Sequence, residues 1–167
     1  GGRALFLRTD VSQAAQVETA VRQTVERFGS LNVLFCVAGL SGRRWGDGPV
    51  AECSEEAWDR VMDINLKSVF LCCKYAVPEM LKTGGGSIVN LSSVLALVGG
   101  DEDFATHAYA ASKGGIVSLT DGNDPDRVLI TTLLGDDQFA SLYEMKLLAG
   151  RFPGTRGALA RVGKAIL

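Results

Sequence analysis

Apolar residues follow two different spacings along this chain. Between residues 12 and 29 they recur every three or four positions, which predicts an amphipathic helix with Ala14, Val17, Val21, Val25 and Phe28 on its buried side. Ser12 is placed to cap this helix, and Gly29 is placed to end it. Residues 31–39 form an almost continuous apolar run, which is typical of a strand buried on both faces.

The two patterns alternate through most of the chain. They predict strands at 4–11, 31–39 and 87–93, and helices at 12–28, 54–81 and 107–120. Ser54 would cap the second of these helices, and Pro78 would bend or fray its last turns. In the tail, a short apolar run lies within 121–137, and residues 138–150 and 157–167 look helical. The alternation predicts one α/β domain, a doubly wound parallel sheet with helices on both faces.

Composition narrows the possible partners. The chain has 167 residues, of which 47% are hydrophobic and 22% charged, as in an ordinary globular domain. A net charge of −2 without a basic run argues against nucleic acid, and no apolar stretch reaches the roughly 18 residues that a membrane span needs.

The four cysteines form no C-x-x-C pair, and the single histidine, His107, has no metal-site spacing to them. We therefore expect no metal site, and buried, reduced thiols in a cytoplasmic protein. A redox disulfide between the neighbouring Cys72 and Cys73 is the less favoured alternative.

The stretch YAASK, residues 109–113, carries candidate chemistry. On a helix, Tyr109 and Lys113 would share one face, one turn apart. A cation beside a phenol lowers the phenol's pKa from about 10, so the tyrosine could exchange a proton with an alcohol or ketone near neutral pH. Taken alone, the pair is more simply an exposed aromatic residue and a solvated lysine.

Three predicted strand ends strengthen the functional interpretation. They carry Asp10–Val11, Ala38–Gly39 and Ser92–Ser93, and the helix with Tyr109 and Lys113 follows the last of them. In an open parallel sheet, ligands bind beyond the carboxyl ends of the strands.

In this order and spacing, the motifs resemble the short-chain dehydrogenase/reductase family over about residues 1–120. The matching segments are DVSQAAQV from Asp10, DINLKSVF around Asn65, GGSIVNLSS ending at Ser93, and YAASK, which fits the family's Y-x-x-x-K. The resemblance implies a Rossmann-like fold and NAD or NADP as cofactor, with Asp10 and Val11 beside the adenine and Val37, Ala38 and Gly39 close to the dinucleotide.

The resemblance also implies the catalytic roles. Tyr109 would be the general acid/base, Lys113 would lower its pKa and hold the cofactor's ribose, and Ser93 would stabilise the substrate oxygen. Asn65, where the family's helix is locally distorted, would hold a water that leads protons to Lys113. From the residues alone, Asn65 is a polar interruption of a helix face. By the same standard, His107 has a surface or loop-packing role rather than a substrate contact, and Trp45 and Trp58 are packing residues rather than substrate platforms.

The chain departs from the family pattern at several places. The glycine-rich T-G-x-x-x-G-x-G turn and the second strand do not occur, so the choice between NAD and NADP is unreadable. The family's NNAG is CVAG here, at residues 36–39, and Val37 lacks the side-chain hydrogen bonds of an asparagine. With the family's first and second strands missing, residues 4–8 and 31–37 would be left with unpaired edges. We therefore expect missing segments, with a seam near Thr120–Asp121; a truncated gene product is the rival explanation.

Two functions remain from the sequence. The favoured one is an NAD(P)-dependent oxidoreductase that interconverts a small secondary alcohol and a ketone; the alternative is a non-catalytic, interaction or scaffold relative. The helices 54–81 and 107–120 carry apolar residues on more than one face, and family members commonly pair these helices. We therefore expect a homodimer or homotetramer, against simple burial of the same side chains, namely Val69, Phe70, Leu71, Ile116, Val117 and Leu119.

Overall fold

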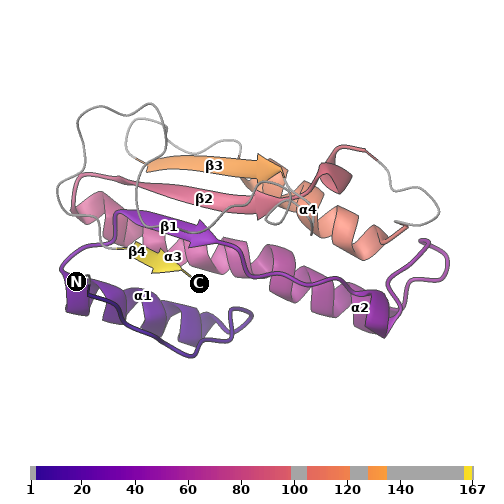
Figure 1. The fold of residues 1–167 in the computed structure, drawn as a ribbon, viewed down its shortest axis with the longest axis horizontal. Coiled ribbons are helices and arrows are strands. Elements are labelled where there is room, and N and C mark those ends of the chain that lie inside the picture. Colours follow the sequence, from indigo (N-terminus) through magenta and orange to yellow (C-terminus); the bar gives the residue numbers. More distant parts are fainter. Residues whose placement is uncertain (1–2, 99–104, 121–127, 135–163, 167) are drawn as a thin grey trace.

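The computed structural model describes residues 3–98, 105–120, 128–134 and 164–166. Its strands are β1 (Val33–Cys36), β2 (Gly86–Ser92), β3 (Val128–Leu134) and β4 (Lys164–Ile166), and they form one sheet in the order β3-β2-β1-β4 (Figure 1). Every pairing is parallel. The predicted Rossmann-like α/β class is therefore confirmed, in an incomplete form.

The helices are α1 (Ala14–Phe28), α2 (Glu55–Val61), α3 (Ser68–Lys82) and α4 (His107–Thr120). Between α2 and α3 the chain continues as a π-helix, η2 (Met62–Lys67), and two short 3-10 turns occur at η1 (Arg43–Trp45) and η3 (Val94–Ala96). The chain thus runs from Glu55 to Lys82 without a break, and Pro78 lies inside α3.

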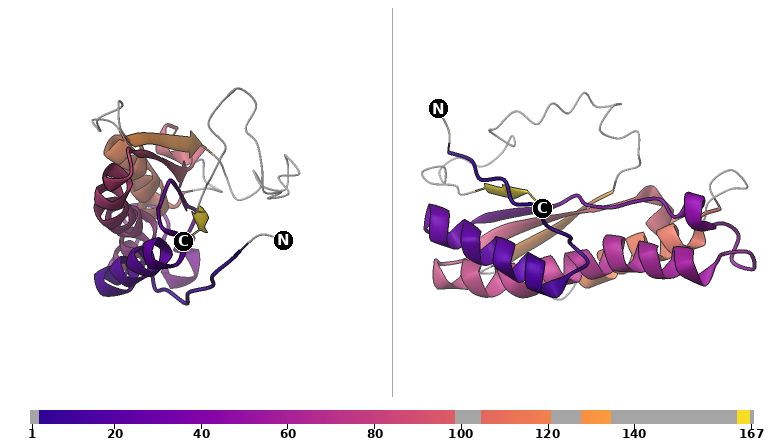
Figure 2. Two further views of the ribbon diagram at one scale, coloured as in Figure 1. Left: turned by 90° about the vertical axis from the view of Figure 1, so that its left-hand side faces the viewer. Right: turned by 90° about the horizontal axis from the view of Figure 1, so that it is seen from below.

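All of the described helices lie on one face of the sheet (Figure 2). The chain moves from β1 through α3 to β2, and from β2 through α4 to β3, always in the same direction across the sheet. Right-handed crossovers taken in one direction place their helices on the same face. The expectation of helices on both faces is therefore not met among the described residues. Because the described helices cover only one face of the sheet, the residues of β1 alternate between half-buried and buried positions instead of being buried on both sides.

Side chains between the sheet and the helices form the core. Val17 and Val21 of α1 face α3, and Leu34 of β1 and Ile88 of β2 are completely buried beneath the helices. The core also contains Leu31, Cys36, Val69, Leu71, Cys72, Ala76, Met80, Ile116 and Val128. Burial of these apolar side chains holds the parallel sheet against its helices.

The helix ends follow the predicted signals with one correction. Gly29 ends α1 in the left-handed region with φ 87°. The Ser54 hydroxyl accepts a hydrogen bond from the Ala57 amide at 3.1 Å, so Ser54 caps α2 as predicted. The cap of α1 is Gln13 rather than Ser12, because the Ser12 side chain bonds to Asp10 instead.

Two sequence-based strand and helix assignments are wrong. Residues 4–10 form no strand, since they have no neighbouring strand to take up their backbone groups, and Phe6 is 88% exposed. Residues 164–166, predicted as part of a helix, are a strand that pairs with Val33–Phe35. That pairing satisfies the β1 edge that we expected to remain open. The helix predicted at 138–150 and the seam at Thr120–Asp121 lie outside the described residues.

Candidate active site

The carboxyl ends of β1 and β2 bring several of the predicted residues to one edge of the sheet. Cys36 of β1 pairs with Asn90 of β2, so the residues that follow both strands leave the sheet side by side. Val37, Ala38 and Gly39 follow β1, and Ser93 follows β2. Helix α4 packs against β2, η2 and η3, which brings Tyr109 and Lys113 to the same edge.

Lys113 is a buried lysine with defined neighbours. Its side chain lies on the same face of α4 as Tyr109, with Nζ 5.5 Å from the centre of the tyrosine ring. Nζ donates a hydrogen bond of 2.8 Å to the carbonyl oxygen of Leu91, near the end of β2, and the residue is only 5% exposed. A buried ammonium group needs such partners, so its position is firmly defined. It is therefore not the solvated lysine of the simpler interpretation.

Asn65 lies in the π-helix η2, so the helix is distorted where the resemblance implies a distortion. The side chain is completely buried. Its Oδ1 accepts from the Leu40 amide at 2.8 Å, and its Nδ2 donates to the Leu40 carbonyl at 3.0 Å and to Ser112 Oγ at 3.1 Å. Asn65 therefore joins the chain after β1 to helix α4. Its predicted role with a water stays a prediction.

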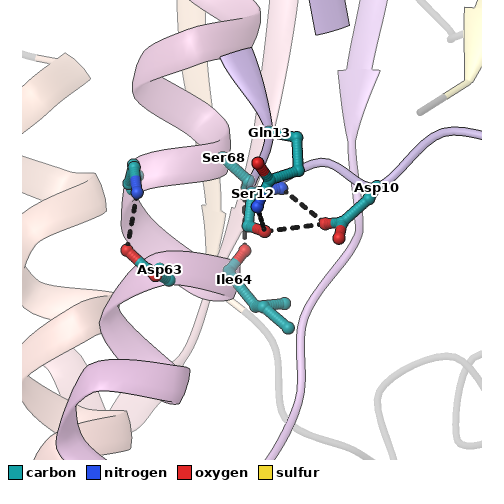
Figure 3. A network of polar contacts seen from close by, with 7 residues as sticks. Asp10, Ser12, Gln13, Asp63, Ile64 and Ser68 are labelled. Carbon is teal, nitrogen blue, oxygen red and sulfur yellow. Dashed lines mark hydrogen bonds and ion pairs between the residues drawn. The ribbon is translucent and has the colours of Figure 1, made fainter. Parts of the chain in front are cut away.

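A side-chain hydrogen bond to the backbone also occurs at the end of the π-helix. In a π-helix each amide bonds to the carbonyl five residues earlier, which disturbs the usual α-helical pairing. The Ser68 hydroxyl donates to the carbonyl of Ile64, four residues before it (Figure 3). Such a bond to the preceding turn disturbs a helix and bends it.

The two serines after β2 have different surroundings. Ser92 Oγ donates to the Lys113 carbonyl at 2.7 Å, so it supports α4 directly. Ser93 Oγ accepts from the Leu95 amide at 3.2 Å and caps η3. Both residues are 1% exposed. The alignment of the Ser93 hydroxyl with the Tyr109 hydroxyl around a substrate stays a prediction.

Asp10 and Val11 form the turn that leads into α1. The Asp10 carboxylate accepts from the Ser12 hydroxyl at 2.7 Å and from the Ser12 amide at 3.0 Å (Figure 3). These bonds favour the charged form and lower the pKa of Asp10, the hydroxyl bond being the larger cause. The Asp10 carbonyl also accepts from the Gln13 amide at 3.0 Å, and the Asp10 amide donates to Gln16 Oε1 at 2.8 Å, so Asp10 orders the start of α1. Contact with an adenine stays a prediction.

Each of the four cysteines is a free thiol, but only Cys36 and Cys72 are buried as expected, and Cys53 and Cys73 are partly exposed. The neighbouring Cys72 thiol and burial raise the pKa of Cys36. Burial, together with the charge of Cys72, raises the pKa of Cys73 to about 11. Cys36 and Cys73 therefore remain protonated at neutral pH and are poor nucleophiles, whereas the hydrogen bond with Cys36 lowers the pKa of Cys72.

Three residues that support the candidate site were missed by the sequence interpretation. Ser92 was set aside in favour of Ser93, and Ser112, which donates to the Tyr109 carbonyl at 2.7 Å, was passed over inside YAASK. Asp47 lies between η1 and α2, and its carboxylate bonds to the first turn of α4. In the sequence, Asp47 is a single acidic residue between two glycines, and this pattern does not predict a contact with a distant helix.

The contacts of His107 and Trp45 agree with a surface or packing role, whereas the exposed Trp58 does not agree with a packing role. The His107 ring nitrogen Nδ1 lies 2.9 Å from the carbonyl oxygen of Gly48, so the ring joins α4 to the loop between η1 and α2. Trp45 is stacked by the Arg44 guanidinium, 3.8 Å from the ring centre, and contacts Arg60. Trp58 lies on α2 and is 42% exposed.

The part of the chain that the structure describes contains no group of three or more metal-binding side chains close enough to hold an ion. Nor does it contain a helix long and apolar enough to cross a bilayer.

The family model for short chain dehydrogenases matches residues 1–125, and the chain therefore belongs to the short-chain dehydrogenase/reductase family. Among curated proteins, it is 39% identical over 120 residues to the cis-4-hydroxycyclohexanecarboxylate dehydrogenase of Sinomonas cyclohexanicum, which covers 72% of this chain and 46% of that protein. It is 38% identical over 114 residues to the 3-oxoacyl-[acyl-carrier-protein] reductase FabG of Staphylococcus aureus, covering 68% of this chain and 44% of the reductase. The chain thus spans less than half the length of these curated relatives.

Solved structures give the same assignment. A short chain dehydrogenase from Mycobacterium smegmatis is 36% identical, with a TM-score of 0.61 over 68% of this chain and 45% of that one. ElxO with NADP bound is 31% identical, with a TM-score of 0.63 over 70% of this chain and 44% of that one. The described sheet and helices therefore share the arrangement of part of these enzymes.

Proposed function

We propose that the protein containing this chain is an NAD(P)-dependent oxidoreductase that interconverts a small secondary alcohol and a ketone. The observation that carries the proposal is the position of the Lys113 ammonium, buried on the same face of α4 as Tyr109 and 5.5 Å from its ring centre. A buried lysine beside a phenol, at the carboxyl edge of a parallel sheet where ligands bind, is the arrangement that general acid/base chemistry needs. The family membership and the relatives described above support the same activity.

The chain's own residues would move the proton. Tyr109, with its ring close to the Lys113 ammonium, would donate a proton to a carbonyl oxygen or take one from a hydroxyl, since the cation favours the phenolate. Ser93 would hydrogen-bond the substrate oxygen and stabilise its developing charge. Asn65 would hold the water that leads protons to Lys113. When bound, the nicotinamide supplies or accepts the hydride.

A dinucleotide would bind beside Gly39 and the Lys113 ammonium. A Cβ atom added to Gly39 would lie 3.6 Å from Lys113 Nζ and 3.4 Å from Asn65 Oδ1, so a larger residue would narrow the space beside the ammonium. Lys113 would hold the ribose hydroxyls of the cofactor there. Val37, Ala38 and Gly39 would lie against the dinucleotide. Asp10 and Val11 would border the adenine. These residues suit NAD and NADP equally.

The remaining features of the proposal follow the family. The chain would be part of one Rossmann-like oxidoreductase domain that occupies residues 1–167, with further segments of the domain missing from it. Free thiols suit the reducing cytoplasm. We also propose a homodimer or homotetramer, formed through the α2–α3 and α4 helices. Of the side chains expected there, Val69, Leu71 and Ile116 are buried in the protein's own core, while Phe70 is 47% exposed and available to a second copy.

The test uses the full-length protein. NAD(H) and NADP(H) are titrated by calorimetry, and hydride transfer is followed at the nicotinamide absorbance with secondary alcohols and ketones, including cyclohexanols and 3-oxoacyl thioesters. Binding of either cofactor, with turnover that Tyr109→Phe abolishes, supports the enzyme. Failure of both cofactors to bind would favour the non-catalytic scaffold, which the change of NNAG to CVAG motivates.

A further inference from the structure

A buried carboxylate from a distant loop holds the first turn of the helix that carries Tyr109. Asp47 Oδ1 accepts a hydrogen bond from the Ala108 amide, and Oδ2 accepts one from the Tyr109 amide, both at 3.0 Å. The first amides of an α-helix have no partner inside the helix, so such a carboxylate satisfies them and also complements the helix dipole. Asp47 is 6% exposed, which places both bonds in a largely water-free environment.

The next residue of the loop adds two contacts to the same turn. The Gly48 carbonyl accepts from the His107 amide at 3.2 Å and lies 2.9 Å from the His107 ring nitrogen Nδ1. Asp47 and Gly48 together therefore hold three consecutive residues at the start of α4. A flexible surface loop would not provide so many directed contacts to a single turn.

The loop itself is fixed from the other side. The Asp47 amide donates to the Gly42 carbonyl at 3.1 Å, and the Ser54 amide donates to the Gly46 carbonyl at 3.0 Å. The Ser54 hydroxyl, which caps α2, also donates to the Trp45 carbonyl at 2.6 Å. The carboxylate is thus supported by the start of α2 and is not free to follow α4 if that helix moves.

Space around Asp47 is also restricted. A Cβ added to Gly42 would come within 2.7 Å of Asp47 Cβ and 2.6 Å of Val61 Cγ2, so the loop packs closely where it turns. The Cys53 thiol contacts Asp47 Oδ1 at 3.7 Å. The carboxylate therefore has one well-defined orientation, toward α4.

We propose that Asp47 is a positioning residue of the active site, and this inference rests on the proposed function. By fixing the first turn of α4, Asp47 sets the direction in which the Tyr109 ring projects toward the substrate. Its negative charge, at the Tyr109 backbone, opposes ionisation of the phenol, whereas the Lys113 ammonium favours it. The carboxylate thus contributes to both the geometry and the proton affinity of Tyr109.

The test compares Asp47→Asn with wild type in the full-length protein. An asparagine turns one acceptor into a donor that faces an amide, so it loosens the first turn and removes the charge. We expect kcat to fall about 10- to 100-fold with little change in KM, because a misplaced catalytic group mainly affects the chemical step. The rise of the oxidation rate with pH should also move to lower pH, because the phenolate is no longer disfavoured. A purely structural residue would leave that pH profile unchanged.

A second readout does not depend on activity. Hydrogen exchange of the amides of Ala108 and Tyr109 should be faster in Asp47→Asn, since both lose their acceptor or have a poorer one. Asp63→Asn is the matched control, because Asp63 is half-exposed on η2 and its carboxylate is paired with Lys67. It should leave the rate, the pH profile and the exchange unchanged.

The outcomes separate the two proposals. If wild type has no hydride-transfer activity, the proposed function fails, and exchange at Ala108 and Tyr109 still tests the contact. If wild type is active and Asp47→Asn keeps its kcat and pH profile, the positioning role is wrong. Should Asp47→Asn be recovered unfolded, Asp47→Ser, which keeps one acceptor, is measured in its place with the same expectations. If both variants unfold, Asp47 is a structural residue and the inference is overturned.

Discussion

The Lys113 ammonium lies 5.5 Å from the centre of the Tyr109 ring, one turn away on α4, and donates to the Leu91 carbonyl of β2. The lysine therefore connects the helix of the candidate catalytic tyrosine to the end of a central strand. A shift of Lys113 would break its hydrogen bond to Leu91. This relationship underlies the first two predictions.

Tyr109→Phe removes the proposed acid/base group and leaves the ring in place. We expect kcat to fall by about 10²- to 10⁴-fold, the usual contribution of a positioned acid or base. The cofactor Kd should stay within a factor of a few, because the ring still packs against Lys113. Steady-state kinetics and calorimetry measure the two quantities. Activity close to that of wild type would mean that another group moves the proton.

Lys113→Met removes the cation and keeps a long apolar side chain. Without the ammonium the phenolate is disfavoured, so the rise of the oxidation rate should move to higher pH, the opposite direction to that expected for Asp47→Asn. Cofactor affinity should also fall if Lys113 holds the ribose. A pH profile of kcat/KM between pH 6 and 10 gives the direction. An unchanged profile would separate Lys113 from the chemistry of Tyr109.

Asn65→Leu tests the connection between the chain after β1 and helix α4. The change leaves the Leu40 amide and carbonyl buried without their partner, so we expect a loss of about 1–3 kcal/mol in the free energy of unfolding. Urea unfolding of the full-length protein measures it.

Asn90→Leu is the matched control for this change. Asn90 is also completely buried, but its amide atoms have no hydrogen-bond partner among the described residues beyond a weak contact with the Cys73 thiol. Its replacement should cost less than that of Asn65. If the two variants lose the same stability, the three hydrogen bonds of Asn65 do not contribute as inferred.

The Cys73 thiol should make stability fall at alkaline pH. Burial raises its pKa from the ordinary 9.0 to about 11, so the folded protein holds this proton where the unfolded chain releases it. The stabilisation is complete below pH 9 and is lost as the pH rises toward 11. A shift of this size corresponds to a change on the order of 2 kcal/mol in the free energy of unfolding. Comparing Cys73→Ala with wild type by urea unfolding at pH 8 and 10.5 isolates this contribution; an equal loss in both proteins would assign it elsewhere.

Phe70→Asp should disrupt the proposed oligomer. Phe70 is the exposed apolar residue of α3, at 47%, and a charge buried at an interface without a partner is costly. Light scattering should find a smaller species for this variant than for wild type at micromolar concentration. Phe6→Asp is the control, since Phe6 is 88% exposed and lies in the segment before α1, on none of the helices proposed to pair. A wild-type monomer would reject the oligomer altogether.

The sequence by itself was sufficient to predict the helices, because the signals for a helix lie within a few residues of one another. The helices at 14–28, 55–82 and 107–120 follow from apolar spacing and from Ser54 and Gly29, because these features act within a few turns. The pairing of Tyr109 with Lys113 likewise follows from the repeat of an α-helix. The membership in the family rests on such short motifs, which survive even though the chain spans less than half of its relatives.

Only the tertiary structure decided the strand pairings and the contacts between residues that are far apart in the sequence. Residues 4–10 have strand-like apolar residues and no neighbour to pair with, whereas 164–166 look helical and become a strand because the β1 edge offers hydrogen bonds. Asp47 and the Tyr109 amide are 62 positions apart, so no local pattern relates them. The backbone amides that Asp47 binds carry no side-chain signature, and only the folded chain brings a loop carboxylate to the start of the helix that carries the tyrosine.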